Sequence, residues 1–155
     1  GEMATIKKME PMKTLPGSLL FACTHNMVRS PMAEALMKAR FAKRIFIDSC
    51  GIHPGTMDGF TVKVMEEVGL DISSHAPKNF DDLQDDYFDM VICFSEESFA
   101  IAREFARGKS TDVEYWPVYD VALTSENQQL RLNAYRYVRD VITRYLNDRF
   151  PDVEN

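Results

Sequence analysis

Cys23 and Arg29 are separated by five residues, and Ser30 and Pro31 follow directly. The thiol follows an apolar segment, and a short loop separates it from the arginine. Such an arrangement can bind a tetrahedral dianion and attack it. The backbone N–H groups of such a loop and the first turn of a following helix can converge on phosphate oxygens. The Arg29 guanidinium can bind two of these oxygens, and the same positive field favours the thiolate form of Cys23. The spacing predicts a phosphate-binding loop over residues 23–30 that carries a nucleophilic cysteine.

A hydrolase built on this loop also needs a proton donor, because cleavage of a P–O ester bond leaves an oxyanion. Asp120 follows the fourth expected strand, at the same edge of a parallel sheet as Cys23, and is the predicted general acid. Asp58 and the Asp81-Asp82 pair are the next candidates. The predicted reaction is hydrolysis of a phosphomonoester through a cysteinyl-phosphate intermediate. The loop residues expected to bind the substrate are Thr24, His25, Asn26, Met27, Val28 and Ser30.

Short apolar segments alternate with helix-period segments along the chain. The expected strands are Ser18–Cys23, Ile45–Asp48, Met90–Cys93 and Val113–Trp116. Four helices are expected. The first begins at a Ser30-Pro31 cap, and the second runs from Phe60 and stops at Gly69. The third runs from Ser95 to near Gly108, and the fourth from Glu126 to Phe150. The last helix is expected to bury Leu130, Ala134, Tyr137, Val138, Val141 and Tyr145. This alternation predicts an α/β fold, a single three-layer domain with a central four-stranded parallel sheet flanked by helices and ligands at the carboxyl ends of its strands.

Length and charge limit the classes of partner. A chain of 155 residues fits one domain, expected at 18–155, after a loose N-terminal tail of residues 1–17. The net charge of -6 opposes binding to nucleic acid. No apolar run approaches the roughly 18 residues of a membrane span, so we expect a cytoplasmic protein without a membrane partner. Three scattered cysteines and three histidines predict reduced thiols, no metal site and no cofactor.

The segment Leu19-Leu-Phe-Ala-Cys23-x-x-Asn26-x-x-Arg29-Ser30-Pro31 resembles the signature of the low-molecular-weight protein tyrosine phosphatases and of the arsenate reductases that share their fold. The similarity runs from Leu19 nearly to Phe150. It includes Ser49-Cys50-Gly51, the stretch Gly69-Leu-Asp-Ile-Ser-Ser-His75 and an aspartate loop after the fourth strand. The resemblance implies a flavodoxin-like fold of the phosphotyrosine phosphatase I type.

The resemblance also implies roles for residues around the nucleophile. Asn26 would hold the loop in a left-handed conformation, which asparagine tolerates better than most residues. Ser30 would donate a hydrogen bond to the Cys23 sulfur and stabilise the departing thiolate. Ser49 and His75 would support the loop from behind. The implied substrates are phosphorylated proteins or small phosphomonoesters, and the loop would also take oxyanions such as phosphate, sulfate or arsenate.

Three departures from the family pattern concern the substrate. Residues 121–123 are Val-Ala-Leu where the phosphatases usually have Pro-Tyr-Tyr, so the aromatic wall of a phosphotyrosine slot is missing or rebuilt, with Tyr119 as one contributor. The loop after Ser49 is shorter than usual and lacks a tryptophan, which leaves residues 52–54 beside the pocket. Met27 stands where the related protein-arginine phosphatases carry a threonine, so that activity gains no support.

Two other functions stay open at this point. Arsenate resembles phosphate, so the loop could serve an arsenate reductase that uses a second thiol. Cys50 and Cys93 do not match the paired resolving cysteines of thioredoxin-coupled reductases, and Val28 stands where a neighbouring loop cysteine is usual. We interpret both thiols as buried small side chains. A reductase would then have to use an external thiol to resolve the adduct on Cys23. A non-catalytic phosphate-binding module is the third possibility, and the joint presence of nucleophile, arginine and acid argues against it.

Overall fold

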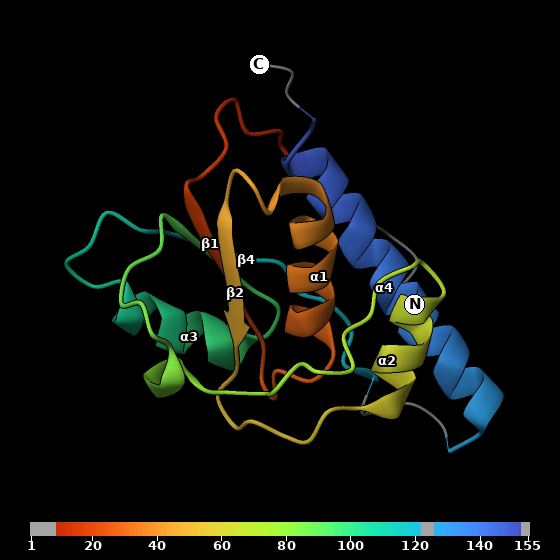
Figure 1. The fold of residues 1–155 in the computed structure, drawn as a ribbon. Helices are drawn as coiled ribbons and strands as arrows, with labels where there is room; N and C mark the ends of the chain where they lie inside the picture. Colours follow the sequence, from red (N-terminus) through yellow and green to blue (C-terminus); the bar gives the residue numbers. More distant parts are fainter. Residues whose placement is uncertain (1–8, 122–125, 153–155) are drawn as a thin grey trace.

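The structure, a computed structural model, describes residues 9–121 and 126–152. Its centre is a sheet of four parallel strands in the order β2-β1-β3-β4 (Figure 1). The strands are β1 (Ser18–Ala22), β2 (Phe46–Cys50), β3 (Met90–Cys93) and β4 (Asp112–Tyr115). The helices are α1 (Arg29–Phe41), α2 (Gly59–Glu66), α3 (Glu96–Phe105) and α4 (Gln128–Arg149), with a short 3-10 helix η1 (Phe80–Asp82). The predicted four-stranded parallel sheet is confirmed: β3 has the expected boundaries, and those of the other strands differ by at most two residues.

The carboxyl ends of the four strands lie level at one edge of the sheet. Ala22 at the end of β1 pairs with Cys50 of β2 on one side and with Cys93 of β3 on the other. Cys93 in turn pairs with Tyr115 at the end of β4. The residues that follow the strands, beginning with Cys23, therefore leave the sheet side by side. In a parallel α/β fold this edge is where ligands bind.

Helices cover both faces of the sheet. Leu19 and Phe21 of β1 belong to the larger core cluster, which includes residues of α1, α2 and α4. Leu20 and Ala22 point to the opposite face and share a smaller cluster with Ala102 of α3. Figure 1 shows α3 on one side of the sheet and α1, α2 and α4 on the other. These are the three layers predicted from the alternation of strands and helices.

The start of α1 differs from the prediction. The helix begins at Arg29, its N-cap is Val28, and no side chain accepts a capping hydrogen bond. Ser30 is therefore not the cap, because its hydroxyl lies in the helix and contacts Cys23 and Asn26 instead. The consequence is that the first turn of α1 contributes its side chains to the site and leaves its N–H groups without a side-chain cap.

The buried face of α4 is only partly the predicted one. Val138, Val141 and Tyr145 are buried as expected, whereas Leu130 is 57% exposed. Tyr135, which was not assigned to this face, is 1% exposed. The helix packs against both α1 and α2: Arg139 contacts Val64 of α2, and Asn147, two turns later, contacts Arg40 of α1. Within the described residues, no helix combines the length and the apolar character needed to cross a membrane.

Residues 9–17 are held against the domain, which differs from the loose tail expected there. Met12 N–H donates to the carbonyl of Arg149 at 2.9 Å, and the Arg149 guanidinium donates to the carbonyl of Glu10 at 2.7 Å. Three side chains of the segment pack against the larger core: Met9, Met12 and Leu15. Residues 1–8 lie outside the described part of the chain, so the expected boundary at residue 18 stays a prediction.

Candidate active site

Cys23 follows β1 directly and opens the loop that leads into α1. Its side chain is 2% exposed and lines a pocket of about 180 Å³ at the carboxyl edge of the sheet. A larger hollow of about 410 Å³ lies between α1 and residues 70–75, but neither Cys23 nor Arg29 lines it. The smaller pocket is the candidate site because it brings together Cys23, Arg29 and Asp120, the three residues predicted to be catalytic.

Arg29 is fixed by the ends of two strands. Its Nη1 group donates to the carbonyl oxygens of Phe94 and Val118, both at 3.1 Å. Phe94 follows β3 and Val118 lies beyond β4, so the sheet edge itself orients the guanidinium. The remaining Nε–Nη2 edge is the one that binds a phosphate or carboxylate with two parallel hydrogen bonds. Arg29 is 6% exposed, which strengthens such contacts by excluding water.

The Cys23 sulfur lies 2.9 Å from the hydroxyl of Ser30. The Ser30 oxygen already accepts a hydrogen bond from the Asn26 side-chain amide at 2.8 Å. Its own proton can then go to the sulfur or to the carbonyl of Cys50, which is 3.4 Å away. The shorter contact favours donation to the sulfur when Cys23 is a thiolate.

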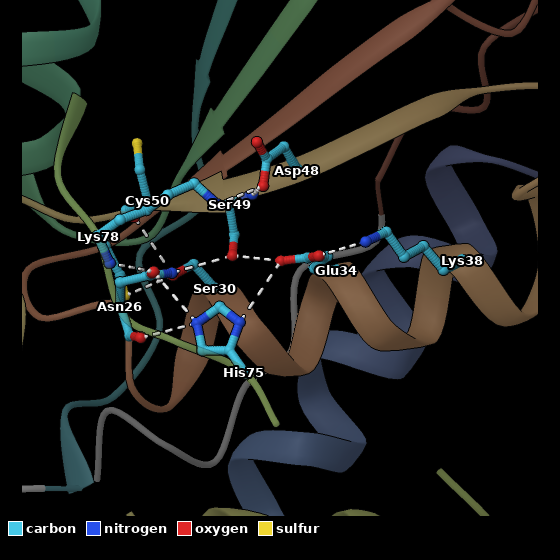
Figure 2. Close-up of polar contacts among 10 residues, drawn as sticks. Asn26, Ser30, Glu34, Lys38, Asp48, Ser49, Cys50, His75 and Lys78 are labelled. Carbon is cyan, nitrogen blue, oxygen red and sulfur yellow. Dashed lines mark hydrogen bonds and ion pairs between the residues drawn. The ribbon is translucent and has the colours of Figure 1, made fainter. Parts of the chain in front are cut away.

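Asn26 connects the loop to three other segments (Figure 2). It is fully buried and has a φ of 53°, in the left-handed region. Its amide nitrogen donates to Ser30 and Ser49, and its side-chain oxygen accepts from the backbone of Lys78 and from His75, at 2.8–3.1 Å. Every hydrogen-bonding group of this side chain is used. These bonds offset the roughly 1–3 kcal/mol that a residue in a sparsely populated backbone region costs.

A further layer lies behind Asn26, as Figure 2 shows. The Ser49 hydroxyl donates to one oxygen of Glu34, and Lys38 donates to the other. His75 Nε2 faces two acceptors, the backbone and side-chain oxygens of Asn26, and so carries the proton, while Nδ1 lies 4.0 Å from Glu34. Burial lowers the pKa of His75, although the Glu34 carboxylate acts in the opposite direction. The neutral imidazole therefore serves as a donor that holds Asn26 in place.

The segment after β2 holds the outer side of the loop. Backbone N–H groups of Ile52 and His53 donate to the Thr24 carbonyl at 2.8 and 2.9 Å, and that of Gly55 donates to the His25 carbonyl at 3.1 Å. These bonds fix the loop carbonyls away from the pocket. Within the described chain, no acceptor pairs with the backbone N–H groups of residues 24–28. The loop therefore keeps a set of unused donors, as an anion cradle requires.

The predicted substrate-binding residues divide into two groups. His25, Met27 and Val28 line the pocket together with Cys23 and Arg29. The other three, Thr24, Asn26 and Ser30, are not part of the pocket wall, and the structure places their side chains or carbonyls in the supporting contacts described above. The His25 ring donates from Nδ1 to the carbonyl of His53 at 2.9 Å, which fixes its orientation at the rim.

Two carboxylates line the pocket, those of Asp58 and Asp120. The Asp120 side chain is 38% exposed, and its Oδ2 lies 3.9 Å from Nη2 of Arg29. Both oxygens of Asp58 accept structural hydrogen bonds, one from the backbone of Phe60 at the start of α2 and one from the Tyr135 hydroxyl. Asp81 and Asp82 are not in the pocket wall. Of the candidate acids, Asp58 and Asp120 line the pocket, and Asp120 lies beside Arg29.

The family model described as low molecular weight phosphotyrosine protein phosphatase matches residues 18–144. The chain belongs to this family. The matched range includes every residue predicted to act in the reaction, and it ends inside α4. The resemblance inferred from the loop motif is therefore confirmed at the level of the family and its fold.

The curated proteins to which the chain is similar are named for two different activities. The glutaredoxin arsenate reductase of a Synechocystis species is 35% identical over 74 residues, which are 48% of this chain and 56% of that protein. A low molecular weight protein-tyrosine-phosphatase of Acinetobacter johnsonii is 29% identical over 107 residues, 64% of this chain and 73% of that one. The chain thus spans about half the length of some curated relatives.

A solved structure described as an arsenate reductase in the phosphate binding state is also similar. It has 27% sequence identity and a TM-score of 0.66, covering 81% of this chain and 90% of that one. A tyrosine phosphatase from Erwinia amylovora shares the fold at 19% identity, with a TM-score of 0.68. The fold of this chain is thus shared by proteins described as phosphatases and by proteins described as arsenate reductases.

Cys50 and Cys93 lie on either side of Ala22 in the sheet, on the face covered by α3. Both are fully buried. Burial raises the pKa of the Cys50 thiol, and it raises that of Cys93 to about 12. Both thiols are protonated at neutral pH, and neither is poised to attack a neighbouring sulfur. Within the described residues, no group of three or more His, Cys, Asp or Glu side chains is placed to hold a metal ion.

The wall opposite the loop is not built as the family pattern implies. Val121 lines the pocket, but Ala122 and Leu123 lie outside the described residues. Tyr119 packs against the larger core and is not part of the pocket wall. An aromatic residue does line the pocket, namely Tyr135 from α4, and Arg131 lies beside it. Among the described residues, the tyrosine of the pocket wall therefore comes from α4, which the sequence did not indicate.

Sequence reasoning missed Glu34, Arg131 and Tyr135. Glu34 lies four residues after Ser30, and Tyr135 lies four residues after Arg131, so each pair shares a helix face. That spacing could have placed Glu34 behind the loop. For Arg131 and Tyr135 no sequence signal was available, because their contact with the pocket depends on how α4 packs.

Proposed function

We propose that this protein hydrolyses phosphomonoesters with Cys23 as the nucleophile, and that protein phosphotyrosine is one form of its substrate. The observation that carries the proposal is a thiol 2.9 Å from a hydroxyl donor, in one pocket with an anchored arginine, a half-exposed aspartate and unused loop N–H groups. The catalytic unit would be residues 18–155. A reducing compartment such as the cytoplasm suits it, because the nucleophile must stay a thiol.

The first step forms the cysteinyl-phosphate. The Cys23 sulfur attacks phosphorus, and an S–P bond forms as the P–O ester bond breaks. Asp120 gives its proton to the leaving oxygen, and the Nε–Nη2 edge of Arg29 with the loop N–H groups stabilises the charge on the equatorial oxygens. His25, Met27 and Val28 would contact the substrate on the pocket side, and Thr24 and Asn26 through the loop backbone.

The second step returns the enzyme to its starting state. The Asp120 carboxylate takes a proton from a water molecule, whose oxygen attacks phosphorus. The P–S bond breaks, inorganic phosphate is released and Cys23 leaves as a thiolate. The Ser30 hydroxyl stabilises that thiolate, while Ser49 and His75 keep Asn26, and with it the loop, in position.

The test is hydrolysis of 4-nitrophenyl phosphate and of phosphotyrosine peptides without added thiol. We expect turnover by the parent protein, none by Cys23→Ser, and kcat lowered about 10²–10⁴-fold for Asp120→Asn on a poor leaving group. Turnover that survives Cys23→Ser would disprove the mechanism. If Asp120→Asn left a poor leaving group unaffected, another residue would be the acid.

A second function, reduction of arsenate, is favoured by the relatives of that name. In this reaction Cys23 attacks arsenic and displaces water, and an external thiol then attacks the Cys23 sulfur. Two electrons pass to arsenic, arsenite leaves, and a mixed disulfide remains for a second thiol to reduce. The burial of Cys50 and Cys93 argues against an internal resolving thiol.

An assay with arsenate and either glutathione or a glutaredoxin distinguishes the two activities. Thiol-dependent arsenite formation without hydrolysis of any aryl phosphate would favour the reductase. Binding of phosphate to Cys23→Ser, with neither hydrolysis nor reduction by the parent, would favour a non-catalytic module.

A further inference from the structure

The wall that faces the phosphate loop is formed by the first turns of α4 and α2. Arg131 and Tyr135 of α4 line the same pocket as Cys23 and Arg29, and Asp58 joins them from the start of α2. The pocket therefore contains a second arginine that comes from a different element from the first. No step of the proposed hydrolysis uses it.

The partners of Arg131 hold it without neutralising its charge. The guanidinium carbon lies 4.5 Å from the centroid of the Phe60 ring, and one of its nitrogens is 3.5 Å from the Tyr135 hydroxyl. Both contacts fix the side chain, the first as a cation–π contact. Within residues 9–121 and 126–152, Arg131 forms no ion pair. Arg136 and Arg139, farther along α4, instead pair with Glu67.

The groups next to Arg131 are already engaged with each other. Tyr135 donates its hydroxyl hydrogen to Asp58, whose other oxygen accepts from the backbone of Phe60. Burial and the Asp58 carboxylate raise the pKa of Tyr135 to about 12, so it remains an uncharged donor. Asp58 is thus satisfied by two hydrogen bonds and does not approach Arg131 closely enough for an ion pair. The donors of Arg131 are left to meet an anion that enters the pocket.

We propose that Arg131 is a second anion-binding group of this pocket and selects phosphomonoesters whose leaving group carries a carboxylate. The inference rests on the proposed hydrolase function and names its substrate class. The scissile phosphate is bound by the loop and Arg29, so the anion that Arg131 meets belongs to the rest of the substrate. Met27, Val28 and Val121 give the space between them an apolar lining. An aryl phosphate with a carboxylate at the far side of its ring has two anionic groups separated by an apolar ring, which matches this arrangement.

The experiment compares matched substrates that differ in one charge. The 3- and 4-carboxyphenyl phosphates are assayed beside the corresponding carboxamides, which have nearly the same shape and no charge. We expect kcat/KM of the parent to favour the better carboxylate over its carboxamide by about 5-fold, the upper size of a half-exposed ion pair. Arg131→Gln should bring this ratio to about 1, and Arg131→Lys should keep part of it.

Arg136→Gln is the matched control, because Arg136 lies on the same helix, pairs with Glu67 and does not line the pocket. It should leave the ratio unchanged. A parent ratio near 1, or a ratio that Arg131→Gln does not alter, would overturn the inference. So would an equal loss on the carboxylate and the carboxamide, since Arg131 would then act on the phosphate itself.

If no aryl phosphate is turned over, the proposed function fails, and the inference is tested by binding. Calorimetry on Cys23→Ser would compare 4-carboxyphenylphosphonate with its carboxamide, with and without Arg131→Gln. Tighter binding of the carboxylate that depends on Arg131 supports the second anion site whatever the reaction. Equal affinity for the two ligands rejects it.

Discussion

Asn26 combines a left-handed backbone conformation with a side chain whose hydrogen-bonding groups are all used. Its φ is 53°, and its side chain contacts Ser30, Ser49, His75 and the backbone of Lys78. The unfavourable backbone conformation and the side-chain hydrogen bonds that support it thus belong to the same residue. Their effects can be separated, because glycine accepts this φ without a side chain and alanine does not.

Asn26→Gly and Asn26→Ala both remove the four side-chain contacts, but only alanine is strained at positive φ. We expect Asn26→Ala to be less stable than Asn26→Gly by about 1 kcal/mol, and both to lower kcat/KM on 4-nitrophenyl phosphate. Urea denaturation of the two variants measures the difference. Equal stabilities would mean that the loop does not need the left-handed conformation.

The positive charge of Arg29 is not sufficient for its predicted role in binding phosphate, because the shape of the guanidinium matters as well. Its Nη1 group is held by the carbonyls of Phe94 and Val118, which leaves the Nε–Nη2 edge for the phosphate. A lysine has one ammonium group and cannot satisfy the carbonyls and two phosphate oxygens together. We expect Arg29→Lys to lower kcat/KM by about 10²–10³-fold with the fold retained by circular dichroism. Arg136→Lys is the surface control, and a loss below tenfold for Arg29→Lys would contradict the assigned geometry.

At the scale of elements, the order of strands and helices could be predicted and the orientation of some side chains could not. Met90–Cys93 is predictable because an apolar run of that length suits a strand covered on both faces. Ser30 is preceded by a loop and followed by proline, which is a capping pattern. Its hydroxyl oxygen nevertheless accepts a hydrogen bond from the Asn26 side chain. Leu130 follows the helical period but is 57% exposed at the start of α4.

The same limit applies to the candidate site. Cys23 and Arg29 could be predicted because their chemistry is local: a strand end, a short loop and a helix start. Glu34, Arg131 and Tyr135 act through contacts with residues that are distant in sequence, namely Ser49, Phe60 and Asp58. Sequence periodicity shows that such residues share a helix face, but it does not show which other element that face meets.

The segment after β2 gives a prediction at this scale. A Cβ atom on Gly51 would lie 2.8 Å from the backbone N of Asn26 and 2.9 Å from the carbonyl O of Thr24, so the two segments approach too closely for any side chain. We expect Gly51→Ala to destabilise the protein by about 1–3 kcal/mol. Displacement of the loop should lower kcat/KM by up to about 10²-fold.

Gly59→Ala is the matched control for this variant. A Cβ atom there meets nothing within 4 Å, and Gly59 begins a helix. Its stability should be unchanged or raised by up to about 1 kcal/mol, with activity as in the parent. Thermal unfolding and 4-nitrophenyl phosphate hydrolysis measure both variants. A Gly51→Ala protein as stable and active as Gly59→Ala would show that the close approach does not fix the loop.

At the scale of the whole molecule, the loop depends on segments that only the folded sheet brings together. The loop of residues 23–30 is held by β2 and the segment after it, by His75 and Lys78, and by the ends of β3 and β4. Because His75 is partly buried where it donates to Asn26, its protonation is linked to the stability of the whole domain.

The linkage predicts a stability loss in mild acid. Burial lowers the pKa of His75 in the folded protein below its ordinary value of 6.5. Below about pH 6.5 the unfolded chain therefore binds more protons at this site than the folded chain does, so the free energy of unfolding falls as pH decreases until the folded pKa is passed. Near pH 8 the imidazole is almost entirely neutral in both states, so the slope approaches zero.

Thermal unfolding of the parent and of His75→Gln between pH 8 and pH 5 measures this effect. Glutamine keeps an amide donor that can reach Asn26 but has no proton to gain, so we expect the variant to lose less of its melting temperature than the parent over this range. His53→Gln removes an exposed imidazole and serves as the control, with the slope of the parent retained. A His75→Gln protein whose melting temperature falls with pH as steeply as that of the parent would show that the acid sensitivity arises elsewhere, and that His75 supports the loop without linking it to pH.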